Sequence, residues 1–328
     1  MKIVFMGTPD FAIPSLKKLL FQRNPFGKSK HTIAAVVSAP DKERGRGREV
    51  SFTPVKEFAI QNKLEVLTPV SLKDQQFIDR LNELDPDLFV VVAFRILPKE
   101  VYSIPKRGSF NLHGSLLPKY RGAAPIQWAL INGETETGVT TFFLEDKVDT
   151  GNIILQKKIE IDSADDFGSL HDKLMTLGAD AVFETVELIE NNSYSLAKQN
   201  DQDASPAPKI TKEICCIDWN RSATEIHNLV RGLSPYPGAF FTHQEKIYKV
   251  FKTCVIENAE PVCRQARLRI ENSKSAIINS QLHLKIFQSK KEIFITTGNG
   301  TLQILELQPE GRKRMTAEEF LRGYSLIK

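Results

Sequence analysis

The sequence predicts an α/β protein whose N-terminal part is a doubly wound, mostly parallel sheet and whose C-terminal part is a small β-barrel of the OB type. Short apolar runs alternate with amphipathic helical patterns through the first 190 residues, which is typical of a parallel sheet covered by helices. The last third instead contains about five short strand patterns beside one small helix, which is typical of a barrel. The 328 residues are enough for two domains with separate cores.

In the first part, strands and helices follow one another as this fold requires. The predicted strands cover residues 2–6, 32–39, 64–67, 87–94, 109–112, 138–145 and 153–161, and the predicted helices cover residues 11–21, 54–62, 74–84 and 165–190. We also expect a helix to open at 121–125 and run to 131. The first strand ends in a glycine turn without a GxGxxG pattern, so a nicotinamide or flavin dinucleotide is not indicated.

The chain is predicted to change domain between residues 190 and 209. Residues 1–190 form the first domain, residues 191–208 are a polar, proline-containing linker, and residues 209–328 form the second domain. The second domain is expected to have a helix at 223–232, a stiff proline-rich turn at 234–240, and a tight hairpin at 298–300. Its predicted strands cover residues 247–256, 265–270, 282–287, 292–297 and 301–307. His227, on the helix, is interpreted as a structural residue.

The charge is distributed unevenly along the chain. Residues 209–328 contain 19 Lys and Arg against 12 Asp and Glu, a net charge of +7, whereas the whole chain has +4. The basic excess therefore lies in the C-terminal third, which suits a polyanionic partner such as a nucleic acid.

Composition excludes several other classes of protein. The four cysteines form no CxxC pair, and no His/Cys cluster has the spacing of a zinc site, so we expect no metal. Sparse thiols without a disulfide pattern are typical of the cytoplasm. We expect no signal peptide and no membrane span, because no apolar run approaches the length of either a membrane helix or a secretory leader.

The strand that ends at His113 places two polar side chains on one face. Side chains two residues apart on a strand point the same way, so Asn111 and His113 face one side while Phe110 and Leu112 face the core. An amide that donates to a developing oxyanion, beside an imidazole that can donate or shuttle a proton, would activate an electrophile. A strand whose polar residues merely cap a turn is the alternative reading of an isolated Asn-x-His.

The surrounding sequence favours the catalytic interpretation. Asn-Leu-His-Gly-Ser-Leu-Leu-Pro at 111–118, followed by Arg-Gly-Ala-Ala-Pro at 121–125, resembles the signature of the formyltetrahydrofolate-dependent formyltransferases. Asp-Thr-Gly at 149–151 matches a second motif of that family. The resemblance covers nearly the whole chain and is strongest to the branch that acts on charged initiator tRNA.

This resemblance implies an activity and a set of site residues. The enzyme would transfer the formyl group of 10-formyltetrahydrofolate to the α-amino group of methionine on initiator tRNA, without a metal and as a monomer. The catalytic residues would be Asn111, His113 and Asp149. The residues implied in folate binding are Ser115, Leu116, Leu117, Pro118, Val92 and Ala93.

Two basic regions are implied in tRNA binding. Arg44, Arg46 and Arg48 lie in an Arg-Gly loop, and Gly45-Arg46-Gly47 resembles an insertion that reaches the acceptor stem in the related tRNA enzymes. The second region belongs to the basic C-terminal domain. Its residues are Lys209, Arg312, Lys313 and Arg314.

At two positions the sequence departs from the family pattern. Phe94-Arg95 replaces a usual Tyr-Gly in a turn that borders the pterin pocket and is one residue shorter here, and Lys147 stands where a glycine is common. Three alternatives stay open: a formyltransferase acting on glycinamide ribonucleotide, one acting on an amino-sugar nucleotide, and an RNA-binding module with an inactive transferase domain. The Arg-Gly loop, the basic second domain and the complete Asn, His and Asp set favour the tRNA enzyme.

Overall fold

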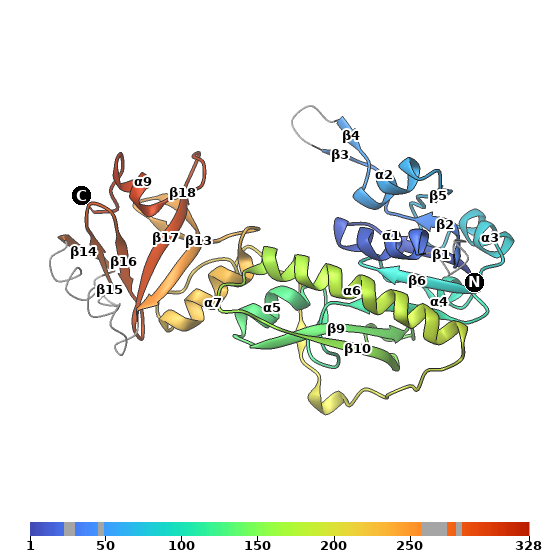
Figure 1. Cartoon of the computed structure of the whole chain (residues 1–328). Helices are drawn as coiled ribbons and strands as arrows, with labels where there is room; N and C mark the ends of the chain where they lie inside the picture. The colour runs from blue at the N-terminus through green and yellow to red at the C-terminus, as the bar shows by residue number, and fades with distance from the viewer. Residues whose placement is uncertain (23–29, 45–48, 257–273, 280–283, 328) are drawn as a thin grey trace. The chain divides into compact units, whose positions relative to one another are not determined.

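The computed structural model describes residues 1–22, 30–44, 49–256, 274–279 and 284–327 (Figure 1). The chain divides into two compact units. The first combines residues 1–125, 136–160 and 171–208, and the second combines residues 126–135, 161–170 and 209–328.

The first unit is built on a seven-stranded sheet with strand order β10-β9-β7-β6-β1-β2-β5. These strands are β1 (Lys2–Gly7), β2 (Thr32–Val37), β5 (Val66–Leu67), β6 (Leu88–Val92), β7 (Ser109–His113), β9 (Glu136–Phe143) and β10 (Ile153–Glu160). The neighbouring strands from β5 through β2, β1 and β6 to β7 are parallel. The pairs β7–β9 and β9–β10 are antiparallel. The predicted mostly parallel sheet is confirmed.

Helices cover both faces of this sheet. They are η1 (Asp10–Ala12), α1 (Ile13–Phe21), α2 (Pro54–Gln61), α3 (Gln75–Glu83), α4 (Lys99–Tyr102) and α6 (Phe167–Glu190). A further helix, α5 (Pro125–Ile131), precedes β9 in the chain. The α6 helix packs on one face, where Gly178 lies against Leu112 and the Thr185 and Thr141 hydroxyls form a 2.7 Å hydrogen bond. Phe89 and Val91 point to the opposite face and pack in the cluster that contains residues of α3 and α4. None of the helices in the described part of the chain is long and apolar enough to cross a membrane.

Two short strand pairs flank the sheet. The pair β3 (Lys42–Arg44) and β4 (Glu49–Ser51) is antiparallel, and β8 (Arg121–Gly122) pairs in parallel with β11 (Pro206–Ala207). The expectation that a helix opens at residue 121 is wrong, because this pairing holds residues 121–122 extended and the helix begins at Pro125. Residues 191–208, which also contain η2 (Asp201–Asp203), pack on this unit, where Ala197 forms an isolated bridge with Ile153.

The second unit contains a curled antiparallel sheet with strand order β12-β13-β17-β16-β15-β14, with β18 paired to β17 (Figure 1). Its elements are α7 (Ala223–Leu233), β12 (Ala239–His243), β13 (Lys246–Ile256), β14 (Lys274–Asn279), β15 (Leu284–Gln288), β16 (Ile293–Thr296), β17 (Thr301–Pro309), β18 (Met315–Thr316) and α9 (Ala317–Leu321). Register shifts between β13 and β17 bend the long strands. The predicted OB-like architecture is confirmed.

The strand predictions for this unit need two corrections. Residues 239–240 were expected in a turn, but they begin β12, because Phe240 pairs with Lys249 as soon as the proline-rich turn is complete. The strand β14 was not predicted, and the predicted strand at 265–270 lies outside the described residues. The hairpin at 298–300 is confirmed by a hydrogen bond from the Thr297 N–H to the Gly300 carbonyl.

Candidate active site

The end of β7 places Asn111 and His113 on the same face of the sheet. Asn111 pairs in register with Val91 of β6, and both residues line one pocket, whereas Phe110 and Leu112 are buried. His113 is 6% exposed and pairs in register with Thr140 of β9. The alternation expected from the sequence therefore brings the amide and the imidazole to one side of the sheet.

The two ring nitrogens of His113 have different partners. Nε2 lies 2.8 Å from the carbonyl oxygen of Tyr120, which can only accept, so Nε2 carries a proton. Nδ1 lies 3.9 Å from Oδ2 of Asp149, which is beyond hydrogen-bonding distance. In its neutral form the ring therefore turns an unprotonated nitrogen towards the carboxylate.

The backbone around Asp149 fixes the position of its carboxylate. Asp149 has φ 56°, and its Oδ2 accepts a 2.9 Å hydrogen bond from the Gly122 N–H. The buried side-chain amide of Gln199 donates to the carbonyl oxygens of Asp149 and Gly151, at 3.0 and 2.9 Å. In the turn over residues 147–151 the left-handed conformation falls on Asp149 rather than on Lys147, so the lysine at the usual glycine position is accommodated without strain.

Two glycines allow the loops around Asp149 to approach one another. A Cβ at Gly151 would lie 1.7 Å from the Phe143 carbonyl oxygen, and one at Gly122 would lie 2.6 Å from the Ala207 carbonyl oxygen. Gly122 also has φ 129°, a conformation that side chains rarely adopt. A larger residue at position 151 would displace the loop that carries Asp149. A larger residue at position 122 would displace the backbone N–H that donates to the Asp149 carboxylate.

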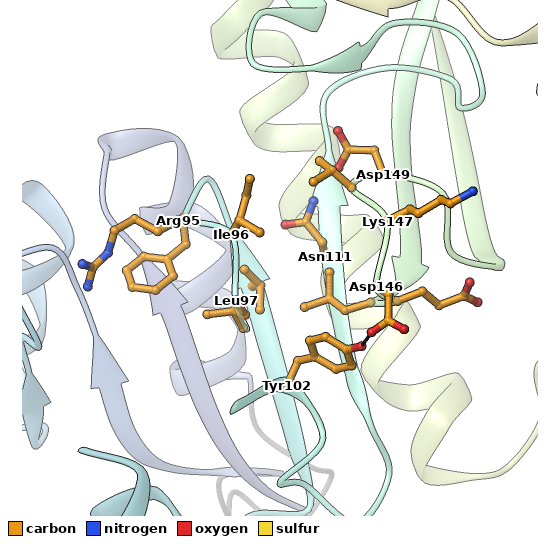
Figure 2. A pocket seen from close by; sticks show the side chains of 13 residues that line it. Arg95, Ile96, Leu97, Tyr102, Asn111, Asp146, Lys147 and Asp149 are labelled. Carbon is orange, nitrogen blue, oxygen red and sulfur yellow. Dashed lines mark hydrogen bonds between the residues drawn. The ribbon is translucent and has the colours of Figure 1, made fainter. Parts of the chain in front are cut away.

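A pocket of about 100 Å³ lies beside Asn111 and Asp149 (Figure 2). Residues 94–97, which follow β6, form one wall, and residues 144–149, which follow β9, form the other. Tyr102 closes one end, where its hydroxyl donates a 2.6 Å hydrogen bond to Oδ1 of Asp146. This bond raises the pKa of Tyr102 to about 12 and lowers that of Asp146.

Arg95 ties one wall of the pocket to a neighbouring loop. Its side chain points away from Asn111 and Asp149 (Figure 2), and it donates to the carbonyl oxygens of Pro69 and Val70 at 2.7 and 3.1 Å. The guanidinium carbon lies 5.3 Å from the centre of the Phe94 ring, and burial lowers the pKa of Arg95. The Phe94-Arg95 departure thus replaces a flexible glycine by a side chain that anchors the wall.

The residues predicted to bind folate occupy two places. Val92 is buried at the end of β6, and the exposed Ala93 after it has φ 48°. Residues 115–118 follow β7 and are tied to the sheet, since the Ser115 hydroxyl donates to the Lys119 carbonyl and the Leu117 N–H donates to the Thr140 hydroxyl. Leu116 is half-buried, and a cis peptide bond joins Leu117 to Pro118. None of the six is among the residues that line the pocket.

The residues predicted to bind tRNA are only partly described. Arg44 ends β3, whereas Arg46 and Arg48 both lie outside the described residues. Lys209 is exposed, as are Arg312, Lys313 and Arg314 in the turn before β18. Arg314 pairs with Glu306 at 2.6 Å and lies over the Phe251 ring.

A cluster of His31, Glu187 and Glu190 is the group of possible metal ligands found among the described residues. Cations already accompany both carboxylates: Lys30 pairs with Glu187, and the Met1 ammonium lies 3.2 Å from Glu190. Burial lowers the pKa of His31 to about 4. The cluster forms an ion-pair network, and none of its three residues lines the pocket.

Sequence reasoning missed Gln199 and Tyr102. Both contact their partners across a long stretch of chain, 50 residues for Gln199 and 44 for Tyr102. A polar residue in a polar segment gives no local signal of burial, so neither could be distinguished from its neighbours. The burial of Gln199, at 7% exposure, becomes visible only when residues 191–208 are packed on the first unit.

Comparison with known proteins assigns this chain to a class. Residues 1–186 match the family described as Formyl transferase, and residues 209–325 match its C-terminal domain. The crystal structure of WlaRD, a sugar 3N-formyl transferase, superimposes with a TM-score of 0.64 at 22% identity, covering 95% of this chain and 99% of that one. An N-formyltransferase from Helicobacter canadensis gives a TM-score of 0.61 at 22% identity, covering 93% and 98% of the two chains. The chain has the fold of the formyl transferases.

Proteins with higher sequence identity to this chain identify its family within the formyl transferases. The methionyl-tRNA formyltransferase of Flavobacterium johnsoniae is 43% identical, covering 98% of this chain and 96% of its own. That of Caldanaerobacter subterraneus is 42% identical, covering 99% and 98%. The chain belongs to the methionyl-tRNA formyltransferase family.

Proposed function

We propose that this enzyme transfers the formyl group of 10-formyltetrahydrofolate to the α-amino group of methionine on charged initiator tRNA. The observation that carries the proposal is the grouping of Asn111, His113 and Asp149 beside a pocket, in a chain of this family. The formyl carbon is an electrophile whose oxygen gains negative charge when the amine attacks it. The enzyme must therefore stabilise that oxygen and remove a proton from the amine.

Asn111 is the proposed donor to the formyl oxygen. Its side chain lies in the pocket (Figure 2), and its amide NH₂ can donate without changing protonation state. Removing one such donor from an oxyanion site costs on the order of 3–4 kcal/mol in other enzymes. Asn111 would thus contribute a large part of the stabilisation of the transition state.

Asp149 and His113 are the proposed proton carriers. Asp149 lines the pocket, whereas His113 is buried behind it and reaches the reaction through the carboxylate. A proton taken from the amine by Asp149 would be shared with Nδ1 of His113, whose Nε2–H stays bonded to Tyr120. That proton would then pass to N10 of tetrahydrofolate as the N10–formyl bond breaks. The attacking amine must be neutral, and an α-amino group titrates near ~8, so much of it is available at neutral pH.

The pocket is the proposed site for the ring end of the formyl donor. A volume of about 100 Å³ accommodates a small ring rather than a whole folate, and its position beside Asn111 would direct the formyl group to that amide. Residues 92–93 and 115–118 adjoin the strands that carry the site, and we keep them as proposed folate contacts. A structural neighbour was solved with 5-N-formyltetrahydrofolate, in keeping with a folate donor.

The arrangement of the chain supports a polyanionic acceptor. We propose a catalytic domain at 1–190, a connecting segment at 191–208 and a tRNA-binding domain at 209–328, which has the net charge of +7. The hairpin formed by β3 and β4 would present the Arg-Gly loop to the acceptor stem. We infer a monomer that acts in the cytoplasm, where charged tRNA is made.

One assay tests the acceptor directly. The enzyme is incubated with labelled 10-formyltetrahydrofolate and, separately, with methionyl initiator tRNA, glycinamide ribonucleotide or an amino-sugar nucleotide. We expect label only in formyl-methionine. Label in a small amine would establish one of the two rival acceptors, and label in none would favour an inactive transferase domain on an RNA-binding protein.

The same assay measures the role of the loop. Arg46→Ala should strongly lower kcat/KM for initiator tRNA and leave the dependence of binding on salt nearly unchanged, because the loop is proposed to position the acceptor end. The control Lys313→Ala/Arg314→Ala should weaken initiator and elongator tRNA alike and flatten the salt dependence. Normal activity of Arg46→Ala would remove the loop from the proposal.

A further inference from the structure

The second unit contains a cavity of about 390 Å³ that no part of the proposed reaction uses. The segment 210–215, the turn 236–238 and the strands β12 and β13 surround it. Hydrogen bonds fix these parts to one another: the Phe240 N–H donates to the Cys215 carbonyl at 2.8 Å, and the Ile217 N–H donates to the Phe240 carbonyl at 2.7 Å. Backbone hydrogen bonds therefore join the segments that form the cavity walls.

The floor of this cavity is apolar. Cys215 is 4% exposed, and burial raises the pKa of its thiol, so the sulfur is neutral at physiological pH. Ile210, Phe240 and Ile247 are only partly covered by the rest of the protein. A flat ligand placed here would remove these side chains from water, which favours its binding.

An aromatic ring stands at the edge of the floor. Tyr236 is 75% exposed, which is unusual for a ring of this size. It lies between Pro235 and Pro237, and proline restricts the backbone, so presenting the ring to a ligand costs little conformational entropy. An exposed, rigidly held tyrosine is suited to stacking on a planar group.

The charges around the cavity are positive. Lys212 is exposed at its edge, and Lys249 is held there by a 2.9 Å hydrogen bond from its ammonium to the Pro237 carbonyl. Among the described residues, the lining contains no acidic side chain. A second cavity of this unit, of about 640 Å³, is lined by Glu213, Asp218 and Glu225 with Arg221, so the positive lining is a property of this site and not of the whole surface.

We propose that this cavity, which we call the Tyr236 site, binds one unpaired nucleotide of RNA. The base stacks on Tyr236 over the apolar floor, and the adjacent phosphate lies between Lys212 and Lys249. Stacking on an aromatic ring beside a basic groove is how single-stranded nucleic acid is held without reading its sequence. The proposal rests on the tRNA acceptor proposed above and assigns to the second unit a specific contact with an unpaired segment of it.

The test uses the full-length enzyme and a labelled single-stranded RNA of about four nucleotides, near the smallest site size of such domains. Binding is followed by fluorescence anisotropy for the parent, Tyr236→Ala, Tyr236→Phe and Lys212→Ala. Tyr236→Ala should weaken binding about tenfold, and Tyr236→Phe, which keeps the ring, should bind like the parent. Lys212→Ala should reduce the slope of log Kd against log salt by roughly one.

Two controls distinguish a nucleotide site from general attraction to a basic surface. Lys290→Ala removes an exposed positive charge from the same unit, away from the cavity, and should not change the effect of Tyr236→Ala. A blunt RNA duplex of equal charge should not respond to Tyr236→Ala, because its bases are paired and stacked. Equal binding by Tyr236→Ala and the parent, or an equal effect of Tyr236→Ala on duplex and single strand, overturns the proposal.

A parallel measurement separates this site from the activity. If the parent formylates methionyl initiator tRNA but Tyr236→Ala binds RNA normally and keeps the parent KM for tRNA, the Tyr236 site fails while the proposed function stands. If the parent does not formylate tRNA but binds single strands through Tyr236, the function fails while the site stands. The thermal unfolding midpoint of each variant verifies that the exposed substitution leaves the fold intact.

Discussion

His113 in the first compact unit and His227 in the second are both largely removed from water, yet their surroundings differ. Nδ1 of His113 faces the Asp149 carboxylate at 3.9 Å, and that carboxylate lines a pocket. Nδ1 of His227 makes a 2.8 Å hydrogen bond with the Thr253 hydroxyl, and none of its partners among the described residues is a carboxylate. Burial, helped by the nearby Arg231, lowers the pKa of His227 to about 4.

The difference shows what makes a buried histidine chemically useful. Burial alone favours the neutral ring, which then serves as a hydrogen-bonding group in a packed interior. A carboxylate beside the ring stabilises positive charge on it, and a pocket beside the carboxylate gives a substrate access to the pair. The first unit provides both features at His113, whereas the partner of His227 among the described residues is the Thr253 hydroxyl.

The largest effect is expected from removing the groups at the end of β7. His113→Ala or Asn111→Ala should lower kcat by at least ~100-fold, because each removes a group that acts in the transition state. Binding of tRNA should change little, as measured by filter binding alongside steady-state kinetics. Near-normal turnover in both variants would show that the site lies elsewhere.

Asp149→Asn should slow the reaction as much as the loss of His113, which acts through this carboxylate, and should also change its pH dependence. The amide keeps the size of the side chain and can still accept from the Gly122 N–H, but it cannot take a proton. We expect kcat to fall by at least ~100-fold and the acid limb of the pH–rate profile to change. An unchanged profile with a normal rate would show that another group carries the proton.

Gln199→Ala tests whether the support of Asp149 matters for the rate. Loss of two hydrogen bonds to the carbonyls of residues 149 and 151 should loosen the carboxylate and reduce kcat by roughly tenfold, with the KM values little affected. Gln202→Ala is the matched control, since Gln202 is exposed in the same segment. Equal rates for the two variants would indicate that Asp149 holds its position without this support.

His227→Gln should leave the rate unchanged and alter only the response of stability to acid. In the parent, the unfolded chain binds a proton near pH 6.5 but the folded chain does so only near pH 4. Stability contributed by the neutral ring is therefore full above pH 6.5 and is lost as the pH falls towards 4, by at most about 3 kcal/mol. Urea unfolding at pH 6.5 and pH 4 should show a smaller decrease in the free energy of unfolding for the variant than for the parent. An equal decrease in the two proteins would mean that other groups titrate.

The sequence was sufficient to predict the site and the sheet where the geometry depends on residues close together in the chain. Asn111 and His113 are two residues apart on one strand, so their shared face follows from strand periodicity. The buried run at 88–92 predicted a central strand, and β6 lies between β1 and β7 as that burial requires.

Distant contacts could not be predicted in this way. The direction of the Arg95 side chain depends on the Pro69 and Val70 carbonyls, which come close only in the folded chain. The strand β12 was missed for a local reason: the prolines before it dominate the pattern, although its pairing partner β13 begins at Lys246, directly after a two-residue turn.

The packing of residues 191–208 has a practical consequence for dissecting the enzyme. A proteolytic or recombinant fragment that stops at Glu190, where the long helix ends, would keep every residue of the proposed catalytic group. It would nevertheless lose Gln199 and the β11 strand that pairs with residues 121–122. The shortest fragment that retains the neighbourhood of Asp149 therefore extends to Pro208, and a protease that cleaves within 191–208 should inactivate the enzyme without touching a catalytic side chain.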